Sequence, residues 1–167
     1  MLLHSYTNGD YRCELYSDGS LVRSWEADNP RAAHPCSIDI KVTDYCNAGC
    51  KYCHEMSTTK GKHGDLDKLL KVLEPLPGGV ELAIGGGNPL SHPHLTQFLQ
   101  ELKRRDIIAN ITINQLHVKP FFNYIKDLVD NELVKGIGIS INSKNYAEIV
   151  ELNQKTDHVV YHVIAGV

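Results

Sequence analysis

Three cysteines lie within eight positions of this 167-residue chain, at Cys46, Cys50 and Cys53, with the spacing C-x3-C-x2-C. Cysteine thiolates bind zinc or iron–sulfur clusters. A structural zinc site is closed by four ligands, commonly from two C-x2-C pairs that lie far apart in the sequence. The two other cysteines of the chain are isolated, so a second pair is absent. A histidine, such as the neighbouring His54, would have to complete a zinc site here.

Three thiolates also suit a [4Fe–4S] cluster, in which they hold three irons and leave the fourth open. An open iron takes a ligand from outside the protein, which a reactive cluster needs and an electron-transfer cluster avoids. Buried structural thiols would not gather in a loop with Asn47, Gly49 and Lys51. The spacing therefore leaves two interpretations, a cluster with an open iron and a zinc site completed by histidine.

Composition and charge narrow the possible function classes. The formal net charge is −3, so the sequence lacks the basic excess that is typical of nucleic-acid-binding proteins. No apolar run approaches the ~20 residues that a membrane helix needs, and the N-terminus has no signal-peptide pattern. Cysteines that cluster locally favour a metal site in a reducing compartment over a disulfide framework. We therefore expect a cytoplasmic protein with neither a membrane nor a nucleic acid as its partner.

The first 36 residues predict a small antiparallel meander followed by a linker. The strand-like runs are residues 2–7, 11–16 and 21–25. They are separated by Asn8-Gly9 and Asp18-Gly19, dipeptides that are typical of tight hairpin turns. We expect residues 1–36 to form a unit that is distinct from the rest of the chain.

Strand-like and helix-like segments alternate over residues 37–167. The predicted strands are residues 37–42, 80–84, 107–113, 136–141 and 159–164, and the predicted helices are residues 66–73, 91–105, 119–129 and 146–152. Such alternation implies parallel strands joined by right-handed crossovers. Because the strands are apolar nearly throughout, we expect a sheet that is covered on both faces. The predicted fold class is α/β, as an open sheet or an incomplete (β/α) barrel of about five core strands.

Glycines and polar residues follow each predicted strand at its carboxyl end, where parallel α/β sheets bind their ligands. These positions are Cys46, Cys50 and Cys53 after the first strand, residues 85–88 after the second, Thr112, Asn114 and Gln115 at the third, Ser140 and Asn142 at the fourth, and Gly166 after the fifth. We therefore expect one rim of the sheet to carry the functional site.

The cysteine spacing, with the aromatic Tyr52 before the last cysteine and a position after the first strand of an α/β unit, resembles the radical S-adenosylmethionine (radical SAM) superfamily. The resemblance covers residues 37–167 and implies a partial parallel (β/α) barrel of that family's type. It implies a [4Fe–4S] cluster on Cys46, Cys50 and Cys53, with S-adenosylmethionine bound to the open iron. In this family, one electron cleaves S-adenosylmethionine to methionine and a 5′-deoxyadenosyl radical, which abstracts a hydrogen atom from a substrate. The electron comes from an external one-electron reductant.

The resemblance also implies contacts with S-adenosylmethionine. Gly86-Gly87-Asn88-Pro89 resembles the family's Gly-Gly-Glu-Pro motif, whose backbone meets the methionine amino group, with Asn88 in place of the glutamate. The other implied contacts are Asn114 near the methionine carboxylate, Ser140 and Asn142 at the ribose hydroxyls, and Tyr52 and Ile164 beside adenine.

Three histidines are further candidates, because His54 can tune a neighbouring cluster by hydrogen bonding and because His117 and His162 can approach the rim.

The end of the chain at Val167 departs from the family pattern, because family cores usually carry more strand–helix units than this sequence supplies. We expect an exposed sheet edge after the last strand. Three interpretations follow: a fragment, a split enzyme completed by a partner chain, or a minimal core that forms a homodimer. The alternative function is a non-catalytic iron–sulfur or zinc-binding subunit that docks through this edge. The substrate, whether a small molecule or a protein, is not readable from the sequence.

Overall fold

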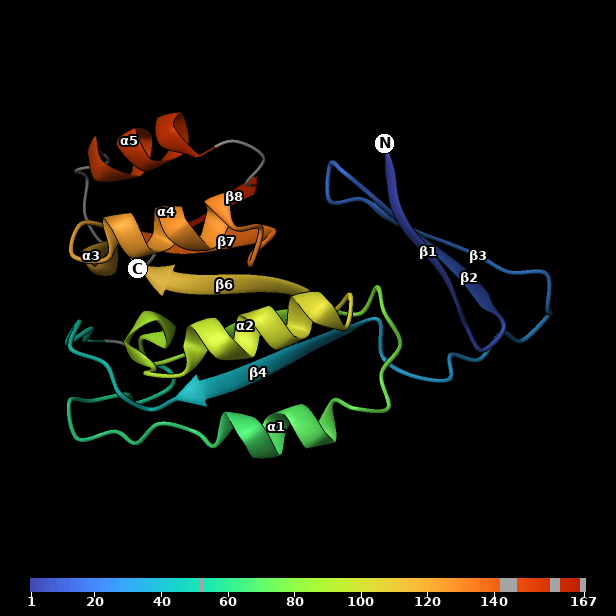
Figure 1. Ribbon diagram of the computed structural model, residues 1–167, viewed down its shortest axis with the longest axis horizontal. Coiled ribbons are helices and arrows are strands. Elements are labelled where there is room, and N and C mark those ends of the chain that lie inside the picture. The colour runs from blue at the N-terminus through green and yellow to red at the C-terminus, as the bar shows by residue number, and fades with distance from the viewer. Residues whose placement is uncertain (52, 142–146, 157–159, 166–167) are drawn as a thin grey trace.

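The structure is a computed structural model that describes residues 1–51, 53–141, 147–156 and 160–165 (Figure 1). The strands are β1 Leu2–Asn8, β2 Tyr11–Tyr16, β3 Leu21–Ser24, β4 Ser37–Thr43, β5 Glu81–Gly86, β6 Ile108–Asn114, β7 Gly136–Ile141 and β8 Val160–Ala165. The helices are α1 Leu66–Val72, the 3-10 turn η1 Pro89–Ser91, α2 Leu95–Arg104, α3 Gln115–Val118, α4 Phe122–Asp130 and α5 Ala147–Lys155.

The N-terminal strands form the predicted antiparallel meander, a sheet in the order β1-β2-β3. Its two hairpin turns use glycines in the left-handed region, Gly9 with φ +61° and Gly19 with φ +84°. Gly9 also lies against the linker, because a Cβ added there would stand 2.1 Å from the carbonyl oxygen of Arg31. The side chains of Cys13 and Leu15 from β2 are buried. The meander is therefore packed on one side and tied to the linker that leads to β4.

The remaining strands form one parallel sheet in the order β4-β5-β6-β7-β8, which confirms the α/β class and the parallel arrangement. Neighbouring strands in this described sheet are therefore also consecutive along the chain. Right-handed crossovers between strands in such an order place every helix on the same side of the sheet. Figure 1 shows α1, α2, α4 and α5 following one another along the sheet in chain order.

The prediction that both faces of this sheet are covered is wrong, because alternate residues of each strand have different surroundings. The residues that face the helices are buried and include Leu82, Ile84, Ile111, Ile113, Ile137 and Ile139. The opposite face, here called the open face, consists, among the described side chains, of Ile108 and of the mostly small or polar residues Ser37, Asp39, Lys41, Glu81, Ala83, Gly85, Asn110, Thr112, Asn114, Gly136, Gly138 and Ser140. Most of these small and polar residues are exposed or half-buried. The helices therefore cover only one side of the sheet.

The helices follow the predicted segments with two differences. Asp65 caps α1 as expected, since its Oδ1 accepts a hydrogen bond from the backbone N–H of Lys68 at 3.0 Å. The segment predicted as one helix from residue 91 is the turn η1 followed by α2. The helix predicted over residues 119–129 is preceded by a separate turn, α3, and Pro120, which has no backbone N–H to donate, stands between α3 and α4.

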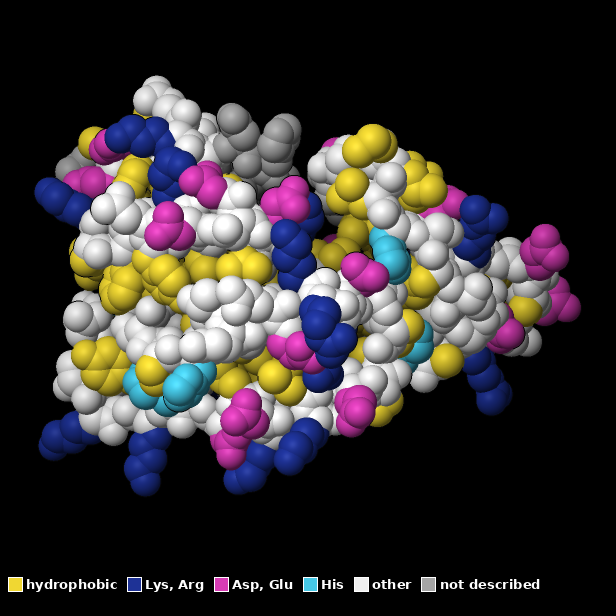
Figure 2. Space-filling model, viewed as in Figure 1, with side chains coloured by type: hydrophobic (Ala, Val, Ile, Leu, Met, Phe, Trp, Pro, Cys, Tyr) yellow, Lys and Arg dark blue, Asp and Glu magenta, His cyan; other side chains and the backbone are white. Residues whose placement is uncertain are grey.

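Basic and acidic side chains are interspersed over the helices on the face seen in Figure 2. Apolar side chains show between the helices there, and a group of histidines lies together near one end of the molecule. In the part of the chain that the structure describes, no helix combines the length and the apolar character that a membrane span requires.

Candidate functional site

The loop that carries the three cysteines begins directly after β4 and is closed by backbone hydrogen bonds. The N–H of Cys46 donates to the carbonyl of Thr58 at 3.0 Å, and the N–H of Thr58 donates to the carbonyl of Asp44 at 3.2 Å. Gly61 lies where the two arms of the loop meet, since a Cβ there would stand 2.0 Å from the carbonyl oxygen of Asp44. The cysteines therefore lie on a loop with a defined base.

Lys41, on the open face at the end of β4, joins both ends of the cysteine-bearing segment. Its Nζ lies 2.6 Å from a carboxylate oxygen of Asp44 and 2.7 Å from one of Glu55. These contacts, first with Asp44 and then with Glu55, raise the pKa of Lys41 above its usual value. Asp44 precedes the first cysteine and Glu55 follows the third, so this lysine links the two flanks of the loop. Sequence reasoning missed this role, because no local pattern pairs a strand lysine with a loop carboxylate.

The three thiols of the loop are free, with Cys50 exposed and Cys46 and Cys53 half-buried. Burial raises the pKa of the Cys50 thiol, and the charges of Cys46 and Cys53 raise it further. Cys46 and Cys53 therefore both act on the thiol of Cys50. Among the residues that the structure describes, no three His, Cys, Asp or Glu side chains surround a position where one metal ion would bind.

This donor set fits an iron–sulfur cluster by its chemistry. Thiolates that hold a cluster bind different irons, so their sulfurs stand further apart than the ligands of one ion do. Three free thiols on one loop that reaches solvent at Cys50, with the amide of Asn114 directed at the sulfur of Cys50, are ligands of the kind that such a cluster takes. The neighbouring His54 is exposed and lies 3.2 Å from Glu55.

The Gly86-Gly87-Asn88 turn lies directly against the strand end that leads into the cysteine loop. The N–H of Gly87 donates to the carbonyl of Thr43, and the N–H of Asn88 donates to the carbonyl of Tyr45, each at 2.7 Å. Gly86 has φ +115°, and a Cβ at Gly87 would stand 2.2 Å from the carbonyl oxygen of Tyr45. Only glycines allow this approach, so the turn and the cysteine loop are built against each other.

Asn88 itself is fully buried and turned toward η1. Its Oδ1 accepts a hydrogen bond from the N–H of Leu90 at 3.2 Å, and its Nδ2 donates to Oγ of Ser91 at 2.8 Å. The side chain of Asn88 therefore caps the following turn, and only the backbone of this segment remains to meet a ligand.

The ends of β6 and β7 supply the other described rim residues. Asn114 and Ser140 are partners in the parallel register of β6 and β7, and Ser140 is the partner of Ile164 in the register of β7 and β8. These three positions therefore form one row across three strands. Tyr52 and Asn142 lie outside the described residues.

Two side chains from the β6–α3 connection contact the cysteine loop. Nδ2 of Asn114 lies 3.2 Å from Sγ of Cys50. Nε2 of His117 donates to Oδ1 of Asn47 at 3.1 Å, which confirms that this histidine approaches the rim. His117 is buried, and burial lowers its pKa. Asn47 gave no signal at the sequence level, since its partner lies 70 residues further along the chain.

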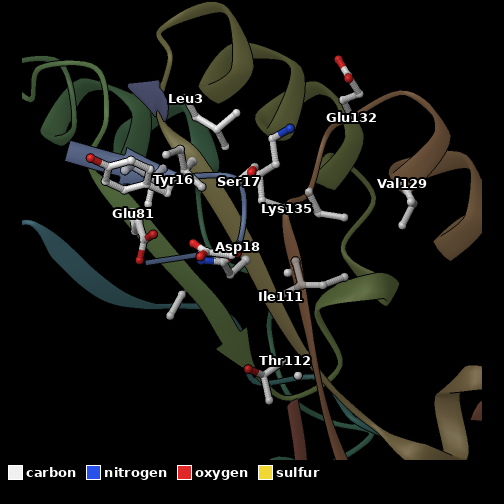
Figure 3. A pocket seen from close by; sticks show the side chains of 18 of the residues that line it. Leu3, Tyr16, Ser17, Asp18, Glu81, Ile111, Thr112, Val129, Glu132 and Lys135 are labelled. Atoms are coloured by element: carbon white, nitrogen blue, oxygen red, sulfur yellow. The ribbon is translucent and has the colours of Figure 1, made fainter. Parts of the chain in front are cut away.

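A cavity of about 1130 Å³ extends from the open face toward the meander (Figure 3). Thr112 lies at one end of the view, and Glu81, Tyr16 and Asp18 lie at the other, where the turn of the meander approaches the start of β5. Glu81 is half-buried, and burial raises the pKa of its carboxyl group. The cavity is therefore lined by both apolar and polar side chains, and it runs along the strands toward the row that contains Asn114.

His92 makes the stability of this region depend on pH. Nε2 of His92 donates to the carbonyl of Gly64 at 2.9 Å, and its Nδ1 accepts from the N–H of His94 at 3.1 Å, which holds the neutral ring. Burial lowers the pKa of His92. The unfolded chain, with a histidine pKa of about 6.5, therefore binds the proton first as the pH falls, and the free energy of unfolding decreases below that pH.

We expect the urea midpoint of the protein to fall between pH 7.5 and pH 5.5, and to fall less in His92→Gln. The exposed neighbour provides the control, because His94→Gln keeps the backbone N–H that binds Nδ1 of His92, and most of the wild-type pH dependence should remain. A His92→Gln variant with an unchanged pH slope would show that the buried ring does not contribute.

Comparison with known proteins gives matches that cover most of the parallel sheet and its helices. Residues 40–160 match the family model described as the Radical SAM superfamily. The chain is also 28% identical over 126 residues to the GTP 3′,8-cyclase of Alkaliphilus oremlandii (strain OhILAs), a match that covers 71% of this chain and 38% of that relative. The chain therefore spans less than half the length of the curated relative that it matches. Because the family model covers most of its residues, the chain belongs to the radical SAM superfamily.

Proposed function

We propose that the chain binds a [4Fe–4S] cluster through Cys46, Cys50 and Cys53 and uses it to cleave S-adenosylmethionine. Family membership supports both cofactors, since the family is defined by them. When bound, they would supply a 5′-deoxyadenosyl radical, formed with one electron from an external reductant, that removes a hydrogen atom from a substrate. The observation that carries the proposal is the direct contact of the cysteine loop with the ends of both β5 and β6.

The chain's own residues would bind and orient the second cofactor along the rim. The backbone of Gly86 and Gly87 is the candidate for the methionine amino group, since the side chain of Asn88 is used within the protein. Ser140 and Asn142 remain the candidates for the ribose, and Tyr52 and Ile164 for adenine. Asn114 stands next to Cys50, where it can reach either the carboxylate of methionine or the sulfur.

We further propose that the open face is the inside of a partial (β/α) barrel and that the substrate binds there. The sequential strand order and the helices on one side support the barrel. Thr112 and Gly138 lie two residues below Asn114 and Ser140, which is about 7 Å along a strand. A molecule in the cavity would thus lie next to the cofactor row. In this proposal residues 1–36 form a separate unit that closes the far end.

The identity of the substrate, and of any partner, is open to direct test. The name of the relative makes GTP the first compound to assay, although the match covers only part of that protein. β8 is an edge of the described sheet, and a partner chain or a second copy could pair with it. The free thiols and the oxygen-sensitive cofactor suit the reducing cytoplasm.

The test is reconstitution of the purified chain with iron and sulfide under anaerobic conditions, followed by dithionite and S-adenosylmethionine. We expect about four irons per chain and the formation of 5′-deoxyadenosine, measured by liquid chromatography and mass spectrometry. A cluster that forms without nucleoside would favour the non-catalytic subunit. Zinc bound in preference to iron would refute the proposal.

A further inference from the structure

The β6–α3 connection holds the cysteine loop at two points that are far apart in sequence. Asn114 reaches Cys50 across 64 residues, and His117 reaches Asn47 across 70 residues. Asn47 directly follows Cys46, so the two contacts fall beside the first cysteine and on the second. One short segment thereby meets two parts of the loop that would hold the cluster.

The amide of Asn114 is oriented by the protein and not only by the sulfur. Its Oδ1 accepts a hydrogen bond from the backbone N–H of Leu116 at 3.0 Å, which caps α3. With the oxygen held there, the NH₂ group must point the other way, toward Sγ of Cys50 at 3.2 Å. The assignment of the amide oxygen and nitrogen is thus fixed by the backbone donor.

His117 is also held in one orientation. It is 2% exposed, and Oδ1 of Asn47 can only accept, so the proton of the ring is on Nε2. Its Nδ1 is buried and lacks a hydrogen-bond partner among the described residues. Among the described residues, the hydrogen bond to Asn47 is therefore the polar contact that orients this ring.

We propose that Asn114 and His117 are positioning residues for the cluster. This proposal rests on the function proposed above. Asn114 donates an N–H···S hydrogen bond to the Cys50 ligand, and His117 fixes the loop through Asn47. Donors to a ligand sulfur spread its negative charge and favour the more reduced cluster. Asn114 therefore raises the reduction potential and makes delivery of the electron to the cluster easier.

The test for Asn114 uses two variants that keep the cap of α3. Asn114→Asp and Asn114→Ser both retain an acceptor for the N–H of Leu116, and neither can donate an amide N–H to Cys50. We expect the midpoint potential of the reconstituted cluster, measured by anaerobic redox titration with electron paramagnetic resonance, to become more negative in both. The urea midpoint and the iron content should stay near the wild-type values.

Asn110→Ser is the matched control, because Asn110 lies on the same strand and face as Asn114 but away from the cysteine loop. Its side chain lies beside Gly136 of β7, where an added Cβ would stand 2.7 Å from Oδ1 of Asn110. Its variant should keep the wild-type potential. An Asn114→Ser cluster with the wild-type potential would overturn the role of Asn114. The neutral serine also separates the loss of the hydrogen bond from the added charge of aspartate.

The test for His117 measures how fast the cluster is lost to a chelator. We expect His117→Leu to lose iron about 10-fold to 100-fold faster, which is the usual effect of removing a residue that orients a metal ligand. Glutamine can place an N–H donor near the position of Nε2, so His117→Gln should retain most of the wild-type lifetime. Equal lifetimes in His117→Leu and the wild type would overturn this part.

These outcomes are distinct from failure of the proposed function. A wild-type chain that holds no four-iron cluster would refute the function itself. A wild-type cluster whose potential and lifetime are matched by the variants would refute only the role of Asn114 and His117.

Discussion

Cys50→Ala is expected to hold no four-iron cluster and to form no 5′-deoxyadenosine above the level of an enzyme-free control. Three thiolates leave one iron open for S-adenosylmethionine, and loss of a further ligand leaves too few protein bonds to retain the cluster. Cys50 is exposed, so its replacement removes little packing. The variant should therefore unfold at the wild-type urea concentration, and its inactivity would come from the missing ligand. Iron content, the visible absorption of the cluster and nucleoside formation are the measurements.

Cys36→Ala provides the matched control for this prediction. Cys36 precedes the first residue of β4, whereas the cysteine loop follows the last, and seven residues of strand separate the two ends by about 20 Å. Sγ of Cys36 lies 4.0 Å from that of Cys13, in the contact between the linker and the meander. We expect this variant to keep the cluster and the cleavage reaction. Wild-type cleavage by Cys50→Ala would contradict the assignment of the ligands.

Gly87→Ala is expected to lower the free energy of unfolding by about 2–3 kcal/mol, as forced overpacking does, and to impair cluster binding with it. The added Cβ would stand 2.2 Å from the oxygen and 2.7 Å from the carbon of the Tyr45 carbonyl. Both are backbone atoms, so the ends of β4 and β5 must separate. The hydrogen bond from Asn88 to Tyr45 then weakens, and the base of the cysteine loop moves.

Gly85→Ala isolates this effect, because Gly85 belongs to the same strand and a Cβ there meets nothing within 4 Å. The free energy of unfolding of Gly85→Ala should stay within about 0.5 kcal/mol of the wild-type value. The two alanine variants are compared by urea denaturation of the metal-free chain and then by iron content after reconstitution. Equal stability of the two would show that the rim accommodates the methyl group without separating the strands.

The nearness of the segments that form the candidate site could be predicted from the sequence, because it follows from topology. Carboxyl ends of parallel strands meet at one edge, so the loop after β4, the glycine turn after β5 and Asn114 at the end of β6 had to lie near one another. The open face was missed although its signal is present. In β7 the residues alternate between isoleucine and the smaller Gly136, Gly138 and Ser140, and a strand of glycine and isoleucine is easily taken as apolar throughout.

The contacts that fasten the cysteine loop could not be predicted in the same way. The bridge from Lys41 to Glu55 and the bond from His117 to Asn47 depend on how a loop of many residues is placed in space. No period or spacing in the sequence encodes such pairs. The capping role of Asn88 was likewise hidden, since a polar residue after a glycine turn can face either a ligand or the next turn.

The sequential strand order also determines how the site can assemble during synthesis. Each strand of the described parallel sheet after β4 pairs with the one made just before it, so the required loop closures are between neighbours in the chain. Chains emerge from the ribosome N-terminus first, and their parts fold as they appear. The cysteine loop can be fastened to β5 and β6 as soon as residue 117 has emerged from the ribosome, while β7 and β8 have yet to emerge. The order of elements along the chain therefore also sets an order of assembly, in which the cysteine loop is fastened before the last strands of the sheet are added.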